Sequence, residues 1–68
     1  MRFHEALSVL IDRKGTFVYN EAGEDKTLRV GVKRTEELPF LYMISSRGTG
    51  PWVPNQLDMF SETWRIYR

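Results

Sequence analysis

Apolar side chains recur near the N-terminus with the period of an α-helix. They occupy positions i, i+3, i+4, i+7 and i+8, which lie on one face of a helix. These residues are Phe3, Ala6, Leu7, Leu10 and Ile11. Gly15 follows them, where a helix commonly ends. The pattern predicts a helix over residues 2–14, with His4 beside the apolar face as a surface residue.

Three later segments have the composition or the alternation of β-strands. Residues 16–19 are β-branched or aromatic throughout, which favours a strand. In residues 27–33, aliphatic residues alternate with polar or small ones, as in a strand with one buried face. A polar turn separates these two segments, so they predict a hairpin. Residues 40–44 are continuously apolar, so we expect them to form the central and most buried strand.

The region after this run combines a loop with a short helix. Residues 45–51 are rich in glycine and serine, which is typical of a flexible loop. Asn55 is a favourable N-cap, and Asp58 stands three residues later, where it completes a capping box. We therefore expect a helix of one to two turns, with Leu57 and Phe60 packed inward.

Residues 63–67 alternate and predict a closing strand. Trp64 and Ile66 are expected on one face and Arg65 and Tyr67 on the other, with Trp64 in the core. Residues 1–68 thus predict a single small domain of the α+β class. In it, an N-terminal helix packs on a small antiparallel β-sheet, and a short helix precedes the last strand.

Chain length limits how this domain can be stabilised. The chain has 68 residues and no cysteine, which excludes disulfides and thiolate metal sites. Its single histidine cannot build a His-based zinc site. A domain of this size buries only about 60% of the surface that its unfolded chain exposes. We therefore expect self-association, as a dimer or a tetramer, and no cofactor or metal.

Charge and hydropathy narrow the possible partners. The net charge of +1 indicates a mixed surface and argues against binding to duplex nucleic acid. No apolar stretch approaches the roughly 20 residues that span a bilayer, so no membrane partner is expected. Residues 1–15 carry Glu5 and Asp12 and do not have the pattern of a signal peptide. The absence of cysteine fits a reducing cytoplasm.

No residue constellation predicts catalysis. His4 is the only imidazole available to activate a nucleophile, and no serine lies in a Gly-x-Ser-x-Gly elbow. The acidic pairs at residues 24–25 and 36–37 are typical of solvated turns. We therefore expect a protein that is not an enzyme.

The sequence contains more residues of the types that bind nucleotides than of the types that catalyse reactions. Aromatic side chains able to stack on a planar base are Phe17, Tyr19, Tyr42, Trp52 and Tyr67. Cations able to hold phosphates are Arg29, Lys33, Arg47 and Arg65. Asn55 and Gln56 carry amides that read a base edge or a ribose. For residues 45–51, both an anion-binding loop and a plain hairpin connection remain open. For Trp52, both a ligand contact and a core position remain open.

The C-terminal segment carries a recognisable motif. Residues 51–64 read Pro-Trp-Val-Pro-Asn-Gln-Leu-Asp-Met-Phe-Ser-Glu-Thr-Trp. This resembles the C-terminal signature of the Thoeris anti-defence two family, Pro-Trp-x-Pro-Ser-Gln-x-Asp-Leu-Leu-Ala-x-Asp-Trp. The opening residues 1–10 also resemble that family's first helix. The family usually has an Arg-x-x-Trp element after this helix, whereas residues 16–20 here contain no tryptophan. By this comparison Phe17 or Tyr19 would stack in its place.

The resemblance implies a function and a location. Members of the family are small phage proteins in the cytoplasm of the infected bacterial host. They bind cyclic nucleotide-derived immune signals, such as glycocyclic ADP-ribose or cyclic oligonucleotides, without cleaving them, and they assemble as homo-oligomers. Together with the chemistry above, it implies ligand contacts from Phe17, Tyr19, Arg47, Trp52, Asn55 and Gln56. Two alternatives remain: direct inhibition of a host protein, and binding of single-stranded nucleic acid on an aromatic sheet face.

Overall fold

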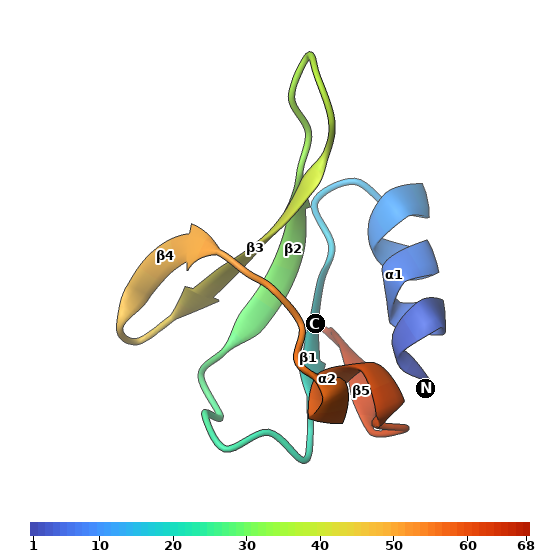
Figure 1. Ribbon diagram of the computed structural model, residues 1–68, viewed down its shortest axis with the longest axis vertical. Helices are drawn as coiled ribbons and strands as arrows, with labels where there is room; N and C mark the ends of the chain where they lie inside the picture. The colour runs from blue at the N-terminus through green and yellow to red at the C-terminus, as the bar shows by residue number, and fades with distance from the viewer.

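The computed structural model describes residues 1–68 and contains a five-stranded antiparallel sheet with its helices on one side (Figure 1). In the sheet the strands follow the order β4-β3-β2-β1-β5. The elements along the chain are α1 (Phe3–Asp12), β1 (Phe17–Asn20), β2 (Arg29–Lys33), β3 (Phe40–Ser45), β4 (Gly48–Pro51), α2 (Gln56–Phe60) and β5 (Trp64–Tyr67). The predicted α+β class and the short helix before the last strand are confirmed. Neither helix has the length and apolar character that crossing a membrane requires.

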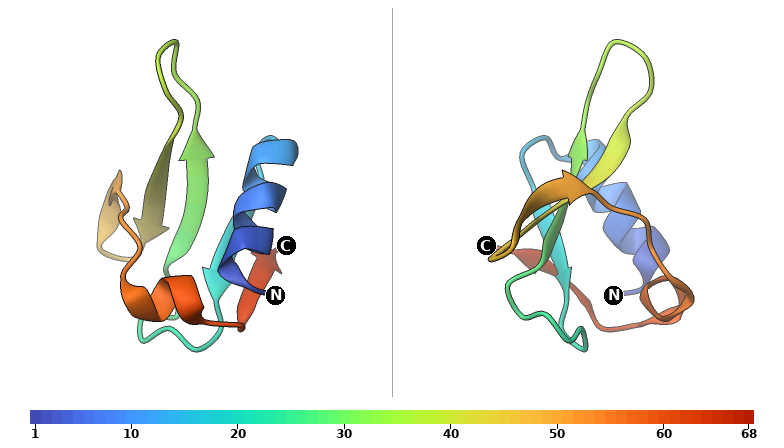
Figure 2. Two further views of the ribbon diagram at one scale, coloured as in Figure 1. Left: turned by 45° about the vertical axis from the view of Figure 1, so that its right-hand side comes forward. Right: turned by 60° about the vertical axis from the view of Figure 1, so that its left-hand side comes forward.

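Helix α1 packs across β1, β2 and β5 and forms the core with them (Figure 2). The buried hydrophobic residues are Ala6, Leu10, Val18, Val30 and Trp64. Trp64 is 1% exposed, and its indole N–H donates to the Asp58 carbonyl at 2.8 Å. Its ring centroid lies 5.4 Å from that of Phe3 in α1. The predicted core position of Trp64 is therefore confirmed.

The central strand is β2, so the prediction that residues 40–44 form the central, most buried strand is wrong. Val30 and Gly31 of β2 are buried, whereas no residue of β3 is. In β3, Leu41 packs toward the core, whereas Tyr42 lies on the other face against Phe17. A continuous apolar run indicates burial on both faces only where both faces are covered. Here no helix covers the second face.

Residues 48–51 form an edge strand rather than the predicted flexible loop. Ser45 pairs with Gly48, so β3 and β4 are joined by a tight hairpin whose turn contains Arg47. Gly48 has a φ of 131°, which glycine adopts without strain. Pro51 lies on the sheet edge, where a missing N–H disrupts no ladder. A hairpin connection is present, as one interpretation of residues 45–51 expected, but only residues 46–47 form it.

The capping box predicted for α2 is confirmed. The Asp58 N–H donates to Asn55 Oδ1 at 2.8 Å, and the Asn55 N–H donates to Asp58 Oδ2 at 3.1 Å. The inward packing predicted for Leu57 and Phe60 is wrong, because each is 81% exposed. Helix α2 meets the core through the Asp58 carbonyl, which accepts from Trp64, and this contact leaves Leu57 and Phe60 exposed.

Candidate functional site

The face of the sheet opposite α1 collects aromatic and cationic side chains. The strand register places every second residue of each strand on this face, because side chains alternate along a strand and partners share a side. We call this set the open face. Its members in β1, β2, β3 and β5 are Phe17, Tyr19, Arg29, Gly31, Lys33, Phe40, Tyr42, Ile44, Arg65 and Tyr67.

Gly31 lets two rings of the open face approach each other. The Phe17 and Tyr42 centroids are 5.9 Å apart at an interplanar angle of 77°. A Cβ on Gly31 would lie 2.8 Å from Phe17 Cε1 and 3.1 Å from Tyr42 Cε1. Any larger residue would therefore displace a ring. The absence of a side chain in the central strand creates this edge-to-face aromatic pair.

A second aromatic pair lies toward the β5 edge. The Tyr19 and Tyr67 centroids are 6.4 Å apart. The guanidinium carbon of Arg29 sits 3.9 Å from the Tyr67 centroid, within cation–π range. A hollow of about 340 Å³ adjoins this pair, and its charged lining residues, Lys26, Arg29 and Arg68, are all cationic.

Only one cation of the open face has a carboxylate partner. Arg65 Nε donates to Glu21 Oε2 at 2.7 Å. This hydrogen bond raises the pKa of Arg65 and lowers the pKa of Glu21. Arg29 and Lys33 make no ion pair, and the Lys33 ammonium lies 6.0 Å from the Tyr42 centroid. Two cations beside the aromatic pairs are therefore available to an anionic ligand.

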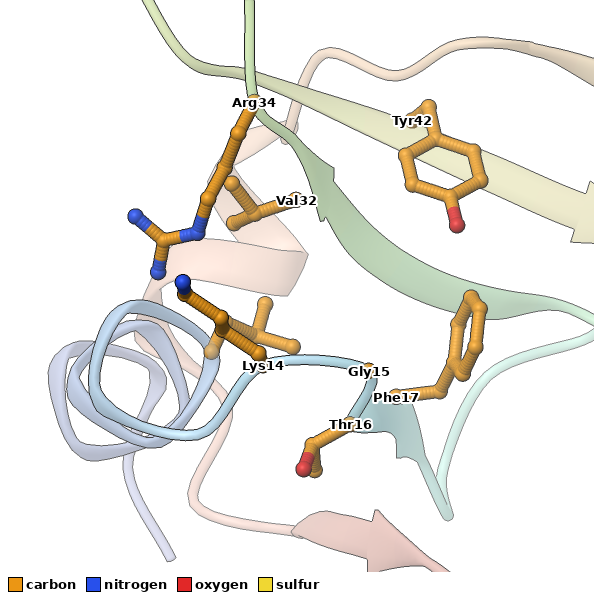
Figure 3. Close-up of a pocket in the computed structure, with 8 residues that line it drawn as sticks. Lys14, Gly15, Thr16, Phe17, Val32, Arg34 and Tyr42 are labelled. Atoms are coloured by element: carbon orange, nitrogen blue, oxygen red, sulfur yellow. The ribbon is translucent and has the colours of Figure 1, made fainter.

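A pocket of about 250 Å³ opens where β1 and β2 diverge. It connects the open face to the end of α1, since Phe17 and Tyr42 line it together with Leu10, Lys14, Gly15, Thr16, Val32 and Arg34. Figure 3 shows Lys14 and Arg34 on one side of this pocket and the two aromatic rings on the other.

The six residues predicted to contact ligand are not assembled into one site in the protomer. Phe17 and Tyr19 lie on the open face. Arg47 occupies the β3–β4 turn and is exposed. Trp52 packs on the core, with its centroid 6.1 Å from Phe3 and 6.0 Å from Trp64. Its observed contacts are thus those of a core residue.

Asn55 and Gln56 begin α2, away from the aromatic pairs. Both line a hollow of about 750 Å³ between α2 and the turn after β1. Its charged lining residues, Glu24 and Asp58, are acidic, and Asn55 Oδ1 is engaged by the capping bond. This hollow is therefore poorly suited to a phosphate.

The open face also contains residues outside the predicted set of six. Tyr42, Tyr67, Arg29 and Lys33 have suitable chemistry, and Gly31 supplies the space. The sequence feature that identifies three of these residues is the alternation of residues 27–33. It places Arg29, Gly31 and Lys33 on the face opposite the buried aliphatic residues. That alternation by itself identifies three residues that share one face of the strand.

Comparison with known protein families and with curated proteins finds no match to this chain. The resemblance of residues 51–64 to the Thoeris anti-defence two family therefore stays a prediction. No group of three or more His, Asp or Glu side chains is placed to hold a metal ion.

Proposed function

We propose that this protein binds and sequesters cyclic nucleotide-derived immune signals without cleaving them. The ligands would be glycocyclic ADP-ribose or cyclic oligonucleotides, held in the cytoplasm of the infected host so that the signal-activated effector stays inactive. The motif of residues 51–64 suggests this function. The open face, with two aromatic pairs beside the unpaired cations Arg29 and Lys33, is the observation that supports it most.

The chemistry of the open face fits a purine ligand. Stacking of a base on an aromatic side chain contributes about 1–3 kcal/mol. Arginine and lysine next to the rings supply donors for phosphate oxygens. A sequestering protein needs these two interactions and no reacting group. A cyclic signal carries few phosphates, so a chain with a net charge of +1 suffices to bind it, whereas a duplex demands many cations.

Self-association, as a dimer or tetramer, is part of the proposal. Of the four exposed apolar side chains in or just before α2, the three most exposed are Val53, Leu57 and Phe60, and we call them the α2 apolar set. They are 83%, 81% and 81% exposed. Pockets for small ligands usually measure about 300–1,000 Å³. The two pockets beside the aromatic pairs measure about 250 and 340 Å³, so one lies below this range and the other at its lower end. A second copy would enlarge the contact available to a dinucleotide.

Retention followed by heat release tests the sequestration. Purified protein is incubated with cyclic dinucleotides, cyclic trinucleotides and cyclic ADP-ribose isomers, filtered, and heated to release what it retained. We expect intact ligand from the wild type and at least tenfold less from Tyr67→Ala or Arg29→Gln, because both remove contacts of the open face. Leu38→Ala is the matched control, since Leu38 is 79% exposed in the loop between β2 and β3. Degraded ligand would indicate an enzyme and overturn the proposal.

A second candidate function is inhibition of a host protein by direct binding. The α2 apolar set favours it, because exposed apolar residues that cluster often mark protein interfaces. The retention experiment, combined with an assay of anti-defence activity in infected cells, separates the two functions. A protein that retains no cyclic nucleotide, yet loses its anti-defence effect on Phe60→Ser, would act through a host protein. Retention of single-stranded oligonucleotide would instead indicate a nucleic-acid binder.

A further inference from the structure

The pocket between the end of α1 and the diverging ends of β1 and β2 has the features of an anion site. We infer that Lys14 and Arg34 hold a phosphate of a nucleotide whose base lies against Phe17 and Tyr42. This inference rests on the proposed function and deepens it, because it names the place of the ligand's phosphate.

Local backbone geometry opens this pocket. Helix α1 ends at Asp12, and Gly15 turns the chain into β1 with a φ of 78°. Strands β1 and β2 share a single register pair, Val18 with Val30, so their ends separate beyond it. Thr16, Val32 and Leu10 of α1 then line the opening. The pocket is therefore formed by the path of the backbone.

The charges of the pocket have one sign. Lys14 and Arg34 are its only charged lining residues, and neither lies in an ion pair. One guanidinium nitrogen of Arg34 donates to the Ile11 carbonyl, which fixes the side chain over the end of α1. A guanidinium has five N–H donors, so most of them stay free for an oxyanion. The Lys14 ammonium adds three more donors on the same side of the pocket (Figure 3).

The two aromatic rings that line the pocket indicate which chemical group carries the phosphate. Phe17 and Tyr42 are half-buried, so part of each ring remains accessible. Their edge-to-face arrangement over Gly31 joins the pocket to the open face. An inorganic phosphate would use the cations alone, whereas a nucleoside phosphate uses the cations and the rings together. The ligand class that fits is therefore a nucleotide with its phosphate directed toward α1.

An NMR titration of the full chain with AMP and with adenosine tests this assignment. We expect AMP to bind at least tenfold more tightly than adenosine, with the largest shifts at Lys14, Thr16 and Arg34. Lys14→Gln should reduce the AMP advantage about tenfold, the loss expected for a charge-assisted hydrogen bond. Adenosine binding should not change. Arg13→Gln is the matched control, because it removes the same charge one residue away without lining the pocket.

Arg34→Gln also removes the contact with the Ile11 carbonyl, so Arg34→Lys accompanies it as the variant that keeps the charge. An AMP advantage that survives Lys14→Gln and Arg34→Gln, or that falls equally in Arg13→Gln, would overturn the inference.

If cyclic nucleotides are retained while the charge variants bind AMP normally, the inference fails and the proposed function stands. If no cyclic nucleotide is retained, the proposed function fails, and the AMP–adenosine comparison still decides about the pocket.

Discussion

At the residue scale, Gly31 is the position on which the open face depends. It lies in the central strand, where a side chain would normally add packing. Its missing Cβ instead lets Phe17 and Tyr42 meet over the backbone at 5.9 Å. Core residues such as Val30 stabilise the opposite face of the same strand. One strand thus serves the core with alternate residues and the candidate site with the others.

Gly31→Ala tests this dependence. The added methyl would contact Phe17 Cε1 at 2.8 Å, so the ring must move. We expect a loss of about 1–3 kcal/mol in the free energy of unfolding, as is typical of overpacking, measured by urea denaturation. Gly50→Ala in β4 is the control, because a Cβ there meets nothing within 4 Å and its φ is not positive. Equal losses in both variants would mean that the ring pair does not constrain residue 31.

At the element scale, local sequence signals predict that helix α2 forms but not which way its apolar side chains face. The capping box of α2 depends on Asn55 and Asp58 alone, so the sequence specifies it. The direction in which Leu57 and Phe60 point depends on where Trp64 reaches the helix from β5, which is a tertiary contact. The sequence does not predict strand β4, because its glycines and proline are equally typical of a loop. The same limit applies to β3, whose apolar run does not reveal that one face is uncovered.

The exposure of α2 leads to a prediction about assembly. Phe60→Ser should leave the unfolding free energy of the protomer within about 0.5 kcal/mol, because the side chain is 81% exposed. If the α2 apolar set joins copies, the same change should reduce the wild-type dimer or tetramer to a species near 8.0 kDa in light scattering. Asn55→Ala provides the contrast, since it should cost about 1 kcal/mol through the lost cap while the oligomer persists. An unchanged oligomer in Phe60→Ser would exclude the α2 apolar set as the interface.

At the scale of the whole molecule, the candidate site follows from which face α1 covers. The sequence predicts the class, the helices and most of the strands from periodicity. It does not specify which strand residues become neighbours, because that depends on the order β4-β3-β2-β1-β5. Phe17 and Tyr42 are far apart in the chain and meet only through this order. Trp52, by contrast, lies in the most recognisable motif of the sequence and packs on the core instead.

Three surface carboxylates have pKa values lowered by the groups that hydrogen-bond to them. The Arg2 backbone N–H lowers the pKa of Glu5, the Arg65 guanidinium lowers that of Glu21, and Thr27 lowers that of Asp25. The ordinary pKa values are 4.5 for Glu5 and Glu21 and 3.8 for Asp25. Each folded carboxyl therefore binds fewer protons than its unfolded counterpart at acid pH. The stability that these groups contribute is present above the ordinary values and is lost as the pH falls through the lowered ones.

Urea denaturation across pH tests this account. The midpoint should vary little between about pH 7 and pH 5 and should fall as the pH drops below about 4.5. Glu21→Gln should make that acid decline shallower, because it removes the carboxyl that pairs with Arg65. Glu36→Gln removes a loop carboxyl that forms no ion pair, and its profile should follow the wild type. A Glu21→Gln profile as steep as that of the wild type would show that the Glu21–Arg65 pair does not contribute to the acid dependence of folding.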